Sequence, residues 1–424
     1  MGRPMDATQL PVAADMITLL LLLSVPVVLL LALDSILRGF YLAVRLFSRT
    51  DAPSQYAMRN TQYAIRNLGV LILACDEAAV IGDTVRYLRQ LAYPQERYQI
   101  MVVADNCQDA TATVARSAGA HVWVRHEPDD VGKGAALRWF TTTAGHTLET
   151  HDAIVILDAD SRVGPEFLVQ VDNLLSQGAA CVQGFLMPMP VTSSLASLLA
   201  AYSELLSQHI DATARWRLGW PAQLYGTGMA FRTELLMALV PSLHTKVEDV
   251  ELTLAALRQA QDTACAFTIP AFVPHAVVYD PKPASTGYVV TQRARWLQGQ
   301  AAIWRTLLRG FWALILRGSV GAKALVFSLL LKPKTLVFAV KVLLCSMLAG
   351  LALTRNNNVA LVLLVVLAAA VLIDVLYYLV GLMWVDQPRL YARALLAAPL
   401  YPVMWMWGIV TATRSGNVWL RARD

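Results

Sequence analysis

The sequence has little charge for its length. Only 15% of its 424 residues are charged, whereas hydrophobic residues make up 56% of the chain. Soluble proteins average about 25% charged residues. A disordered chain needs low hydrophobicity together with high charge, so this composition excludes disorder. It also argues against an ordinary water-soluble enzyme, and we expect lipid to solvate part of the chain.

Cysteine is also scarce, and the five cysteines follow no recognisable pattern. Their number is odd, and no two of them have the Cys-x-x-Cys spacing that is typical of zinc sites. We therefore expect neither a disulfide framework nor a zinc centre. Reduced thiols that act as small buried side chains are the simpler interpretation.

Positive charge is scarce in the middle of the chain. Residues 51–318 carry 21 basic and 24 acidic side chains, and the flanking residues carry 14 and 6. A nucleic-acid-binding protein would place its positive charge on the globular part, so we expect no nucleic-acid partner. Basic residues beside apolar segments instead favour membrane lipids with anionic headgroups as partners.

Long apolar segments lie only near the two ends and divide the chain into four parts. We predict an N-terminal transmembrane helix with a basic flank (1–50), an α/β domain (51–290), amphipathic interface helices (291–332) and a C-terminal membrane region of two to three spans (333–424). A cleaved signal peptide is the alternative for Met16–Leu33, but the run is long and no small-residue cleavage site follows it. The arginines after this run predict that the N-terminus lies outside and the α/β domain inside.

The C-terminal region contains two segments that are each long enough to span a membrane, Thr335–Thr354 and Val359–Leu382. A third segment, Leu395–Thr411, is interrupted by prolines, and the topology of the C-terminus is left open. Lys341 and Asp374 lie within the first two segments. Charges inside a membrane indicate either a functional site or a structural pair between helices, and both interpretations are kept.

Residues 304–315 have the apolar periodicity of a helix. Six apolar residues recur at helical spacing, and two arginines lie off this stripe. The stripe consists of Trp304, Leu307, Leu308, Phe311, Trp312 and Ile315. A helix packed on the domain core is one interpretation. We prefer a helix in the plane of the membrane interface, because tryptophan and arginine are enriched in the headgroup layer.

Between residues 65 and 160, apolar β-rich runs alternate with amphipathic stretches. The runs predict buried strands, and the amphipathic stretches predict helices. The predicted strands are Leu68–Ala74, Gln99–Ala104, His121–Arg125 and Ala153–Leu157, and the predicted helices are Asp83–Leu91, Thr111–Gly119 and Gly134–His146. Strands that alternate with helices imply right-handed crossovers, so we predict an α/β fold with a mostly parallel sheet.

Carboxylates follow three of the predicted strands. Asp76 and Glu77 come after the first strand, Asp105 after the second, and Asp158 and Asp160 after the fourth. Ligands of open α/β sheets bind at the carboxyl ends of the strands. Carboxylate oxygens suit Mg²⁺ or Mn²⁺, which takes the rest of its shell from water and substrate phosphates. Each acid alone could be a turn or N-cap residue, but three strand ends with acids together indicate a site.

Further candidates follow along the chain. Lys133 stands between two glycines at a helix start, where it can meet a base or a phosphate or remain a solvated loop residue. Glu248 and Asp249 begin a helical stretch, where acidic residues are ordinary choices. Gln292, Arg295, Trp296 and Gly299 share one face of a predicted helix, and an amide, a cation and a ring suit a diphosphate and a sugar.

The order of these motifs resembles that of membrane-integrated family 2 glycosyltransferases, a group that includes cellulose, chitin and hyaluronan synthases. The resemblance covers residues 65–318 and departs from the family pattern at two positions, where Asp76 replaces Asn and Val247 replaces Thr. The matching motifs are Cys75-Asp76-Glu77, Asp105, Asp158-Ala159-Asp160, Val247-Glu248-Asp249 and Gln292-Arg293-Ala294-Arg295-Trp296. The resemblance implies a GT-A fold, which is a Rossmann-like domain, with flanking transmembrane and interfacial helices.

The resemblance also implies a role for each matching residue. Asp158 and Asp160 would hold the metal, and Asp249, with Glu248 beside it, would be the catalytic base. Trp296 and the loop Gly226-Thr227-Gly228 would bind the acceptor, where glycine permits close backbone approach. The donor would be bound by Asp76, Glu77, Asp105, Lys133, Asp158, Gln292, Arg293 and Arg295.

The function that this resemblance implies is a membrane-bound inverting glycosyltransferase. It would use Mg²⁺ or Mn²⁺ to move a sugar from a UDP-sugar donor to a growing β-linked polysaccharide. The alternative is transfer of one sugar to a lipid acceptor, such as a polyprenyl phosphate, a diacylglycerol or a carotenoid. A transporter or scaffold is disfavoured because the acids at the strand ends are present. We expect an integral protein of a prokaryotic plasma membrane with a cytoplasmic catalytic domain, and we leave its oligomeric state open.

Overall fold

The computed structural model describes residues 9–48, 64–189, 194–245, 247–263, 268–282, 299, 312–396 and parts of 398–410. The chain divides into two compact units, which are described separately. The helical unit contains Met1–Leu46 and Phe327–Pro388, and the α/β unit contains Phe47–Val326 and Arg389–Asp424.

The α/β unit is built on one eight-stranded sheet of order β3-β2-β1-β4-β7-β6-β8-β5. Strands β1, β2, β3 and β4 are parallel, and so are β6 and β8, whereas β7 is antiparallel to both of its neighbours and β5 to β8. The strands are β1 (Leu68–Ala74), β2 (Tyr98–Asp105), β3 (His121–Arg125), β4 (Ala153–Asp158), β5 (Arg162–Val163), β6 (Cys181–Met189), β7 (Met229–Arg232) and β8 (Ala271–Pro281). The predicted mostly parallel α/β fold is confirmed.

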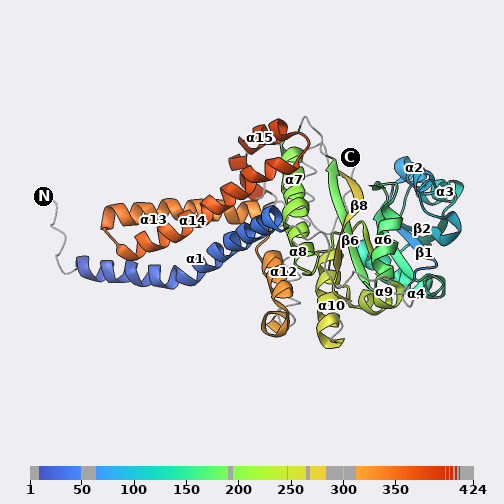
Figure 1. Ribbon diagram of the computed structural model, residues 1–424, viewed down its shortest axis with the longest axis horizontal. Coiled ribbons are helices and arrows are strands. Elements are labelled where there is room, and N and C mark those ends of the chain that lie inside the picture. The colour runs from blue at the N-terminus through green and yellow to red at the C-terminus, as the bar shows by residue number, and fades with distance from the viewer. Residues whose placement is uncertain are drawn as a thin grey trace. The chain divides into compact units, whose positions relative to one another are not determined.

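Helices cover both faces of this sheet, because each central strand is apolar on both sides. Alternate residues of β1 illustrate this: Val70 and Ile72 pack in one core cluster with α2, α3 and α6, whereas Leu71 and Leu73 pack in the other with α4, α9 and α10. Figure 1 shows these helices around the strands. They are α2 (Ala78–Leu88), α3 (Thr111–Ser117), α4 (Lys133–Thr143), α5 (Gly145–Glu149), α6 (Phe167–Ser176), α9 (Thr233–Leu239) and α10 (Glu248–Thr263).

The rest of the α/β unit contains further helices that the sequence pattern did not predict. The helix α7 (Leu195–Leu206) continues through a π-helical turn, Ser207–Ala212, into α8 (Thr213–Arg217). The helix α15 (Pro388–Leu396) also belongs here except for Pro388. Most of α12 (Val320–Leu330) belongs here too, and α12 lies within residues 291–332, where interface helices were predicted. Of the predicted amphipathic stripe, residues 304–311 lie outside the described residues. Within the helical residues 312–317, Trp312 is exposed.

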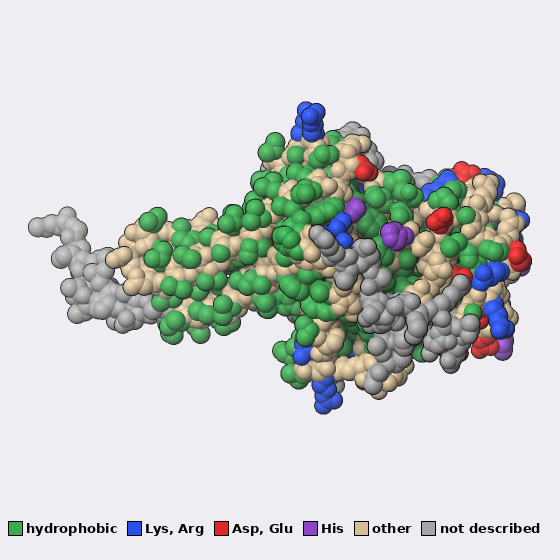
Figure 2. Space-filling model, viewed as in Figure 1, with side chains coloured by type: hydrophobic (Ala, Val, Ile, Leu, Met, Phe, Trp, Pro, Cys, Tyr) green, Lys and Arg blue, Asp and Glu red, His purple; other side chains and the backbone are tan. Residues whose placement is uncertain are grey.

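Three helices of the helical unit are long and apolar enough to cross a membrane: α1 (Gln9–Phe47), α13 (Lys334–Arg355) and α14 (Asn358–Val380). They pack on one another through an apolar cluster that includes Leu31 and Leu367. Many large hydrophobic side chains of these helices are exposed, and Figure 2 shows such side chains on the visible face, as expected for helices that cross a membrane. Of the predicted segment Leu395–Thr411, residues 397, 401, 404, 405, 408, 409 and 411 lie outside the described residues.

Charged residues from all three long helices meet inside the helical unit, and we call them the charge network. Lys341 of α13 donates to Asp374 of α14 at 2.8 Å, to Asp34 of α1 at 3.0 Å and to the Ser35 hydroxyl at 2.7 Å. Arg38 pairs with Asp374 at 3.2 Å, and Lys334 pairs with Asp34. Lys341 and Asp374 are completely buried. These contacts support the structural interpretation of the two charges, because each is paired with a neighbouring helix.

Candidate active site

The carboxyl ends of the central parallel strands bring the predicted acids to one edge of the sheet. In the β1–β4 pair, Leu73 is opposite Asp158, and in the β1–β2 pair, Ala74 is opposite Ala104. Asp105 follows Ala104 directly and ends β2. The strand ends therefore lie side by side, and this edge is the candidate active site.

Asp158 ends β4, and the side chain of Lys133, the first residue of α4, forms an ion pair with it. Burial raises the pKa of Asp160 to about 6, and the nearby carboxylate of Asp158 adds to this rise. Burial and a neighbouring carboxylate both disfavour the ionised form of a carboxyl group. A divalent cation bound beside it would favour the ionised form again. The donor set, hard carboxylate oxygens at the carboxyl end of β4, fits Mg²⁺ or Mn²⁺.

The loop Gly226-Thr227-Gly228 lies directly against Asp158. Strand β7 begins after this loop and pairs antiparallel with β4, and the Gly228 amide donates to the Ile156 carbonyl at 2.9 Å. The Thr227 hydroxyl accepts a hydrogen bond from the Asp158 amide at 3.1 Å. Both glycines have positive φ, +82° at Gly226 and +64° at Gly228, a conformation that costs other residues free energy. The loop therefore needs glycine at both positions in order to approach Asp158 this closely.

Glu248 and Asp249 begin α10 beside the same loop. A Cβ atom added to Gly226 would lie 3.4 Å from Oε1 of Glu248 and 3.9 Å from Cβ of Asp249. A Cβ atom added to Gly134 would lie 3.4 Å from Cβ of Glu248. The structure therefore brings together the Lys133 helix, the glycine loop and the two acids that were predicted as catalytic.

Of the predicted Gln-Arg-Ala-Arg-Trp motif, Gln292, Arg293, Arg295 and Trp296 lie outside the described residues. Gly299, on the same predicted helix face, is described and buried. A Cβ atom on Gly299 would lie 2.6 Å from Cγ1 of Val247, the residue before Glu248. Val247 therefore packs against the bare backbone at Gly299, where a larger residue would clash with it.

Asp105 has a partner that the sequence analysis missed. The completely buried side chain of Arg125, at the end of β3, donates to Oδ1 of Asp105 at 2.7 Å and also pairs with Asp130 at 3.0 Å. Burial raises the pKa of Asp105, and the hydrogen bond from Arg125 opposes this rise. The sequence did contain one signal for Arg125, since this residue ends the predicted strand β3. Because β3 pairs in parallel with β2, the end of β3 lies opposite Asp105.

Asp76 and Glu77 connect β1 to the start of α2. Oδ1 of Asp76 accepts from the amides of Gln108 at 2.6 Å and Asp109 at 3.2 Å, and Asp76 has a φ of +54°. Aspartate and asparagine tolerate this left-handed conformation better than other side chains, which explains how Asp replaces Asn here. The Glu77 amide donates to the Thr111 hydroxyl at 2.7 Å. These bonds hold the loops after β1 and β2 together.

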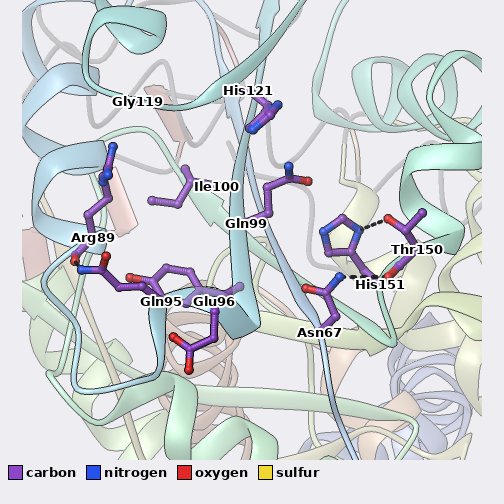
Figure 3. A pocket seen from close by; sticks show the side chains of 11 residues that line it. Asn67, Arg89, Gln95, Glu96, Gln99, Ile100, Gly119, His121, Thr150 and His151 are labelled. Carbon is purple, nitrogen blue, oxygen red and sulfur yellow. Dashed lines mark hydrogen bonds between the residues drawn. The ribbon is translucent and has the colours of Figure 1, made fainter.

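A polar hollow of about 450 Å³ lies at the opposite edge of the sheet. Its lining residues precede or begin the strands, as His151 does for β4 and His121 for β3 (Figure 3). The His151 Nδ1 lies 2.8 Å from the Thr147 carbonyl, and burial lowers its pKa. This hollow contains none of the predicted site residues, so it is separate from the acidic edge.

The fold and the acidic edge define a glycosyltransferase of the GT-A type. Residues 66–299 match the model of a family described as Glycosyltransferase like family 2, and the chain belongs to this family. It is therefore a member of family 2 of the glycosyltransferases.

Two curated relatives are about a quarter identical to this chain over the matched regions. A probable glycosyltransferase of Bacillus subtilis, YdaM, is 24% identical over 264 residues, which are 60% of each protein. A beta-monoglucosyldiacylglycerol synthase of Trichormus variabilis is 24% identical over 282 residues, which are 64% of this chain and 56% of the synthase. The match thus spans less than two thirds of either relative.

A mannosyltransferase of Pyrobaculum calidifontis, solved with GDP-mannose and Mn²⁺, is similar to this chain with a TM-score of 0.48 and 18% identity. The similarity covers 87% of this chain and 99% of that one. A glucosyl-3-phosphoglycerate synthase of Mycobacterium tuberculosis, solved with Mn²⁺, UDP-glucose and phosphoglyceric acid, has a TM-score of 0.37 and 20% identity over 58% of this chain and 80% of its own.

Proposed function

We propose that this enzyme transfers a single sugar from a UDP-sugar donor to the hydroxyl or phosphate of a membrane lipid, with Mg²⁺ or Mn²⁺ as cofactor. The observation that carries the lipid acceptor is the filled interior of the helical unit. Leucine and valine side chains and the charge network pack between α1, α13 and α14. Because these side chains fill the space between the three described helices, we expect no passage there for a growing polymer.

The likeness to beta-monoglucosyldiacylglycerol synthases supports this choice of acceptor. The long apolar helices support it independently, because they keep the enzyme at the membrane where a lipid acceptor is concentrated. We further propose that the α/β unit lies in the cytoplasm, where nucleotide sugars are made, with the basic residues that follow the first span on the same side.

In the proposed reaction, Asp249 accepts the proton of the acceptor hydroxyl. The acceptor oxygen forms a bond to the anomeric carbon, while the bond from that carbon to the diphosphate oxygen breaks and the configuration inverts. A positioned base supplies typically about 10²–10⁴-fold of the rate. We place the acceptor beside the loop at Gly226, because this loop lies next to Asp249: a Cβ atom on Gly226 would be 3.9 Å from the Cβ atom of Asp249.

Asp158 and Asp160 would hold the metal, which when bound supplies positive charge for the departing diphosphate. Lys133 pairs with Asp158 and supplies a further positive charge at the same edge. Arg295, Gln292 and Arg293 would bind the diphosphate from the segment before Gly299. Asp76, Glu77 and Asp105 would hold the base and ribose, and Trp296 would contact the acceptor.

Synthesis of a β-linked polysaccharide is the second candidate. The Gln292-Arg293-Ala294-Arg295-Trp296 motif favours it, because this motif is common in processive synthases. In that case the described three-helix bundle would need additional helices, from this chain or a second copy, to form a passage.

A coupled assay of nucleoside diphosphate release tests the proposed function. The purified enzyme in lipid nanodiscs would be given UDP- and GDP-sugars, with and without added lipid extract and with Mn²⁺, Mg²⁺ or a chelator. We expect release from a UDP-sugar that requires both the metal and the lipid extract, and that Asp249→Asn abolishes. Release that is independent of lipid and proceeds with water would contradict a lipid acceptor.

A further inference from the structure

The charge network of the helical unit contains more positive than negative charge. Three cations, Arg38, Lys334 and Lys341, face two carboxylates, Asp34 and Asp374, so the five residues together carry a formal charge of +1. Apart from that of Lys334, each of these side chains is no more than 6% exposed. A surplus charge that is enclosed by apolar helices is costly unless an ion of opposite sign lies beside it.

The hydrogen bonds and ion pairs show the same imbalance. Each carboxylate oxygen of the network is already in contact with a cation: the two of Asp34 with Lys334 and Lys341, and the two of Asp374 with Arg38 and Lys341. Nη2 of Arg38, in contrast, is buried, lies 3.5 Å from Oδ2 of Asp34 and has no hydrogen-bond partner among the described residues. The network therefore lacks a negatively charged acceptor rather than a donor.

An anion can reach the network at Lys334. The side chain of Lys334 is 21% exposed, and it pairs with Asp34, the same carboxylate that Nη2 of Arg38 approaches. Lys334 is also the first residue of α13, and Pro333 before it makes no side-chain cap. A helix N-terminus has amide groups without intrahelical partners and a positive partial charge, and both favour a phosphate. The exposed lysine, the surplus charge and the helix start thus coincide.

We propose that the charge network binds the phosphate group of a membrane lipid at Lys334. The phosphate accepts hydrogen bonds from Lys334 and from the first amides of α13, and its negative charge balances the surplus. A lipid is the source that fits this place, because α1, α13 and α14 are long and apolar enough to cross a membrane. The site lies within the helical unit, and the inference does not depend on the proposed sugar transfer.

The test is lipid binding to the purified full-length enzyme in a neutral detergent, measured by native mass spectrometry without donor. Two matched pairs serve as probes, phosphatidic acid with diacylglycerol and a polyprenyl phosphate with its polyprenol, because the members of each pair differ in the phosphate. We expect the phosphate-bearing member to bind about tenfold more tightly, since its phosphate meets a lysine and a helix start. Equal affinities within both pairs would overturn the proposal.

The two pairs also identify the lipid. The same preference in both pairs would support a site that recognises the phosphate of membrane lipids in general, and a preference within the polyprenyl pair alone would support a site for that class of lipid. Inorganic phosphate in excess should not displace the bound lipid. Displacement by inorganic phosphate would show that the site takes free phosphate, and it would contradict a lipid ligand.

Variants of two lysines separate the contact from the charge balance. Lys334→Met removes both and should reduce the preference for the phosphate-bearing lipid to less than about twofold, whereas Lys334→Arg should keep it. Lys341 is completely buried, so it makes no contact with the lipid, yet Lys341→Met removes the surplus charge and should reduce the preference to about threefold. Arg355→Met is the matched control, because it removes an exposed cation from the last turn of the same helix, and the preference should not change.

A full preference in Lys334→Met would overturn the site. A full preference in Lys341→Met would overturn the role of the surplus charge, since a simple contact with Lys334 would not need it. If Lys334→Met does not fold, the matched lipids and Lys341→Met still decide the inference. Loss of the preference in Arg355→Met would show attraction of the lipid phosphate to exposed cations in general, and it would also contradict a site at Lys334.

Discussion

Asp374→Asn should destabilise the helical unit more than Lys341→Met does, although both break the same buried ion pair. The charge network contains three cations and two carboxylates. Lys341→Met leaves Arg38 and Lys334 to pair with Asp374 and Asp34, and no charge is stranded. Asp374→Asn leaves all three cations around one carboxylate, inside helices that are long and apolar enough to cross a membrane.

The magnitudes follow from the contacts. Lys341→Met removes three hydrogen bonds, but Asp34 and Asp374 keep other cations as partners. We therefore expect it to lower the unfolding free energy by about 1.5–3 kcal/mol, as for hydrogen bonds to charged groups. Asp374→Asn leaves an uncompensated buried charge, which typically costs about 3–5 kcal/mol. The double variant relieves part of the surplus positive charge, so it should be more stable than Asp374→Asn alone.

Thermal unfolding of the purified enzyme in detergent measures this order, with Arg355→Met as the control. Arg355 is exposed in the last turn of α13, so its replacement should change the unfolding free energy by no more than about 0.5 kcal/mol. Equal losses in the two single variants, with strictly additive effects in the double variant, would refute the proposed charge balance.

Other expectations concern the α/β unit. Asp249→Asn should lower turnover by about 10²–10⁴-fold while nucleoside diphosphate binding, measured by calorimetry, survives; equal loss of both would argue against a base. Because burial raises the pKa of Asp160 to about 6 and only the ionised form binds a cation, Mn²⁺ affinity should fall by up to tenfold per pH unit below about pH 6 and level off above it. An affinity that stays constant from pH 5 to pH 7 would be inconsistent with that shift. Gly228→Ala should destabilise the fold by about 1–3 kcal/mol, because the new Cβ would lie 2.3 Å from Val278 on a backbone in the left-handed conformation. Gly145→Ala is the control and should be tolerated, since its nearest neighbour would be 3.7 Å away. Similar melting temperatures for the two variants would contradict the close packing of the loop.

The first half of the sheet was predictable because its strands are continuous apolar runs. His121–Arg125 was predicted with its observed bounds, and Ala153–Leu157 was predicted one residue short. The predicted helix Asp83–Leu91 begins five residues too late, since α2 starts at Ala78 directly after the turn at Asp76. Helix starts of this kind depend on the conformation of the preceding loop, which the apolar periodicity does not report.

The second half of the sheet carried much weaker signals. Strand β5 is two residues long, β7 is four, and β8 contains Pro274, so no apolar run of typical strand length marks them. Their positions depend on pairing with distant segments. Arg125 was missed for the same reason, because its partner Asp105 lies in another strand.

The measurement that tests the account most directly is the mass of the product. The full-length enzyme in nanodiscs would be incubated with Mn²⁺, a lipid extract and a panel of UDP-sugars, and the lipid and aqueous fractions would be analysed by mass spectrometry. The account predicts one lipid species that gains the mass of a single sugar and is absent with Asp249→Asn. A ladder of oligosaccharides that differ by one sugar would contradict single transfer to a lipid and establish a polysaccharide synthase.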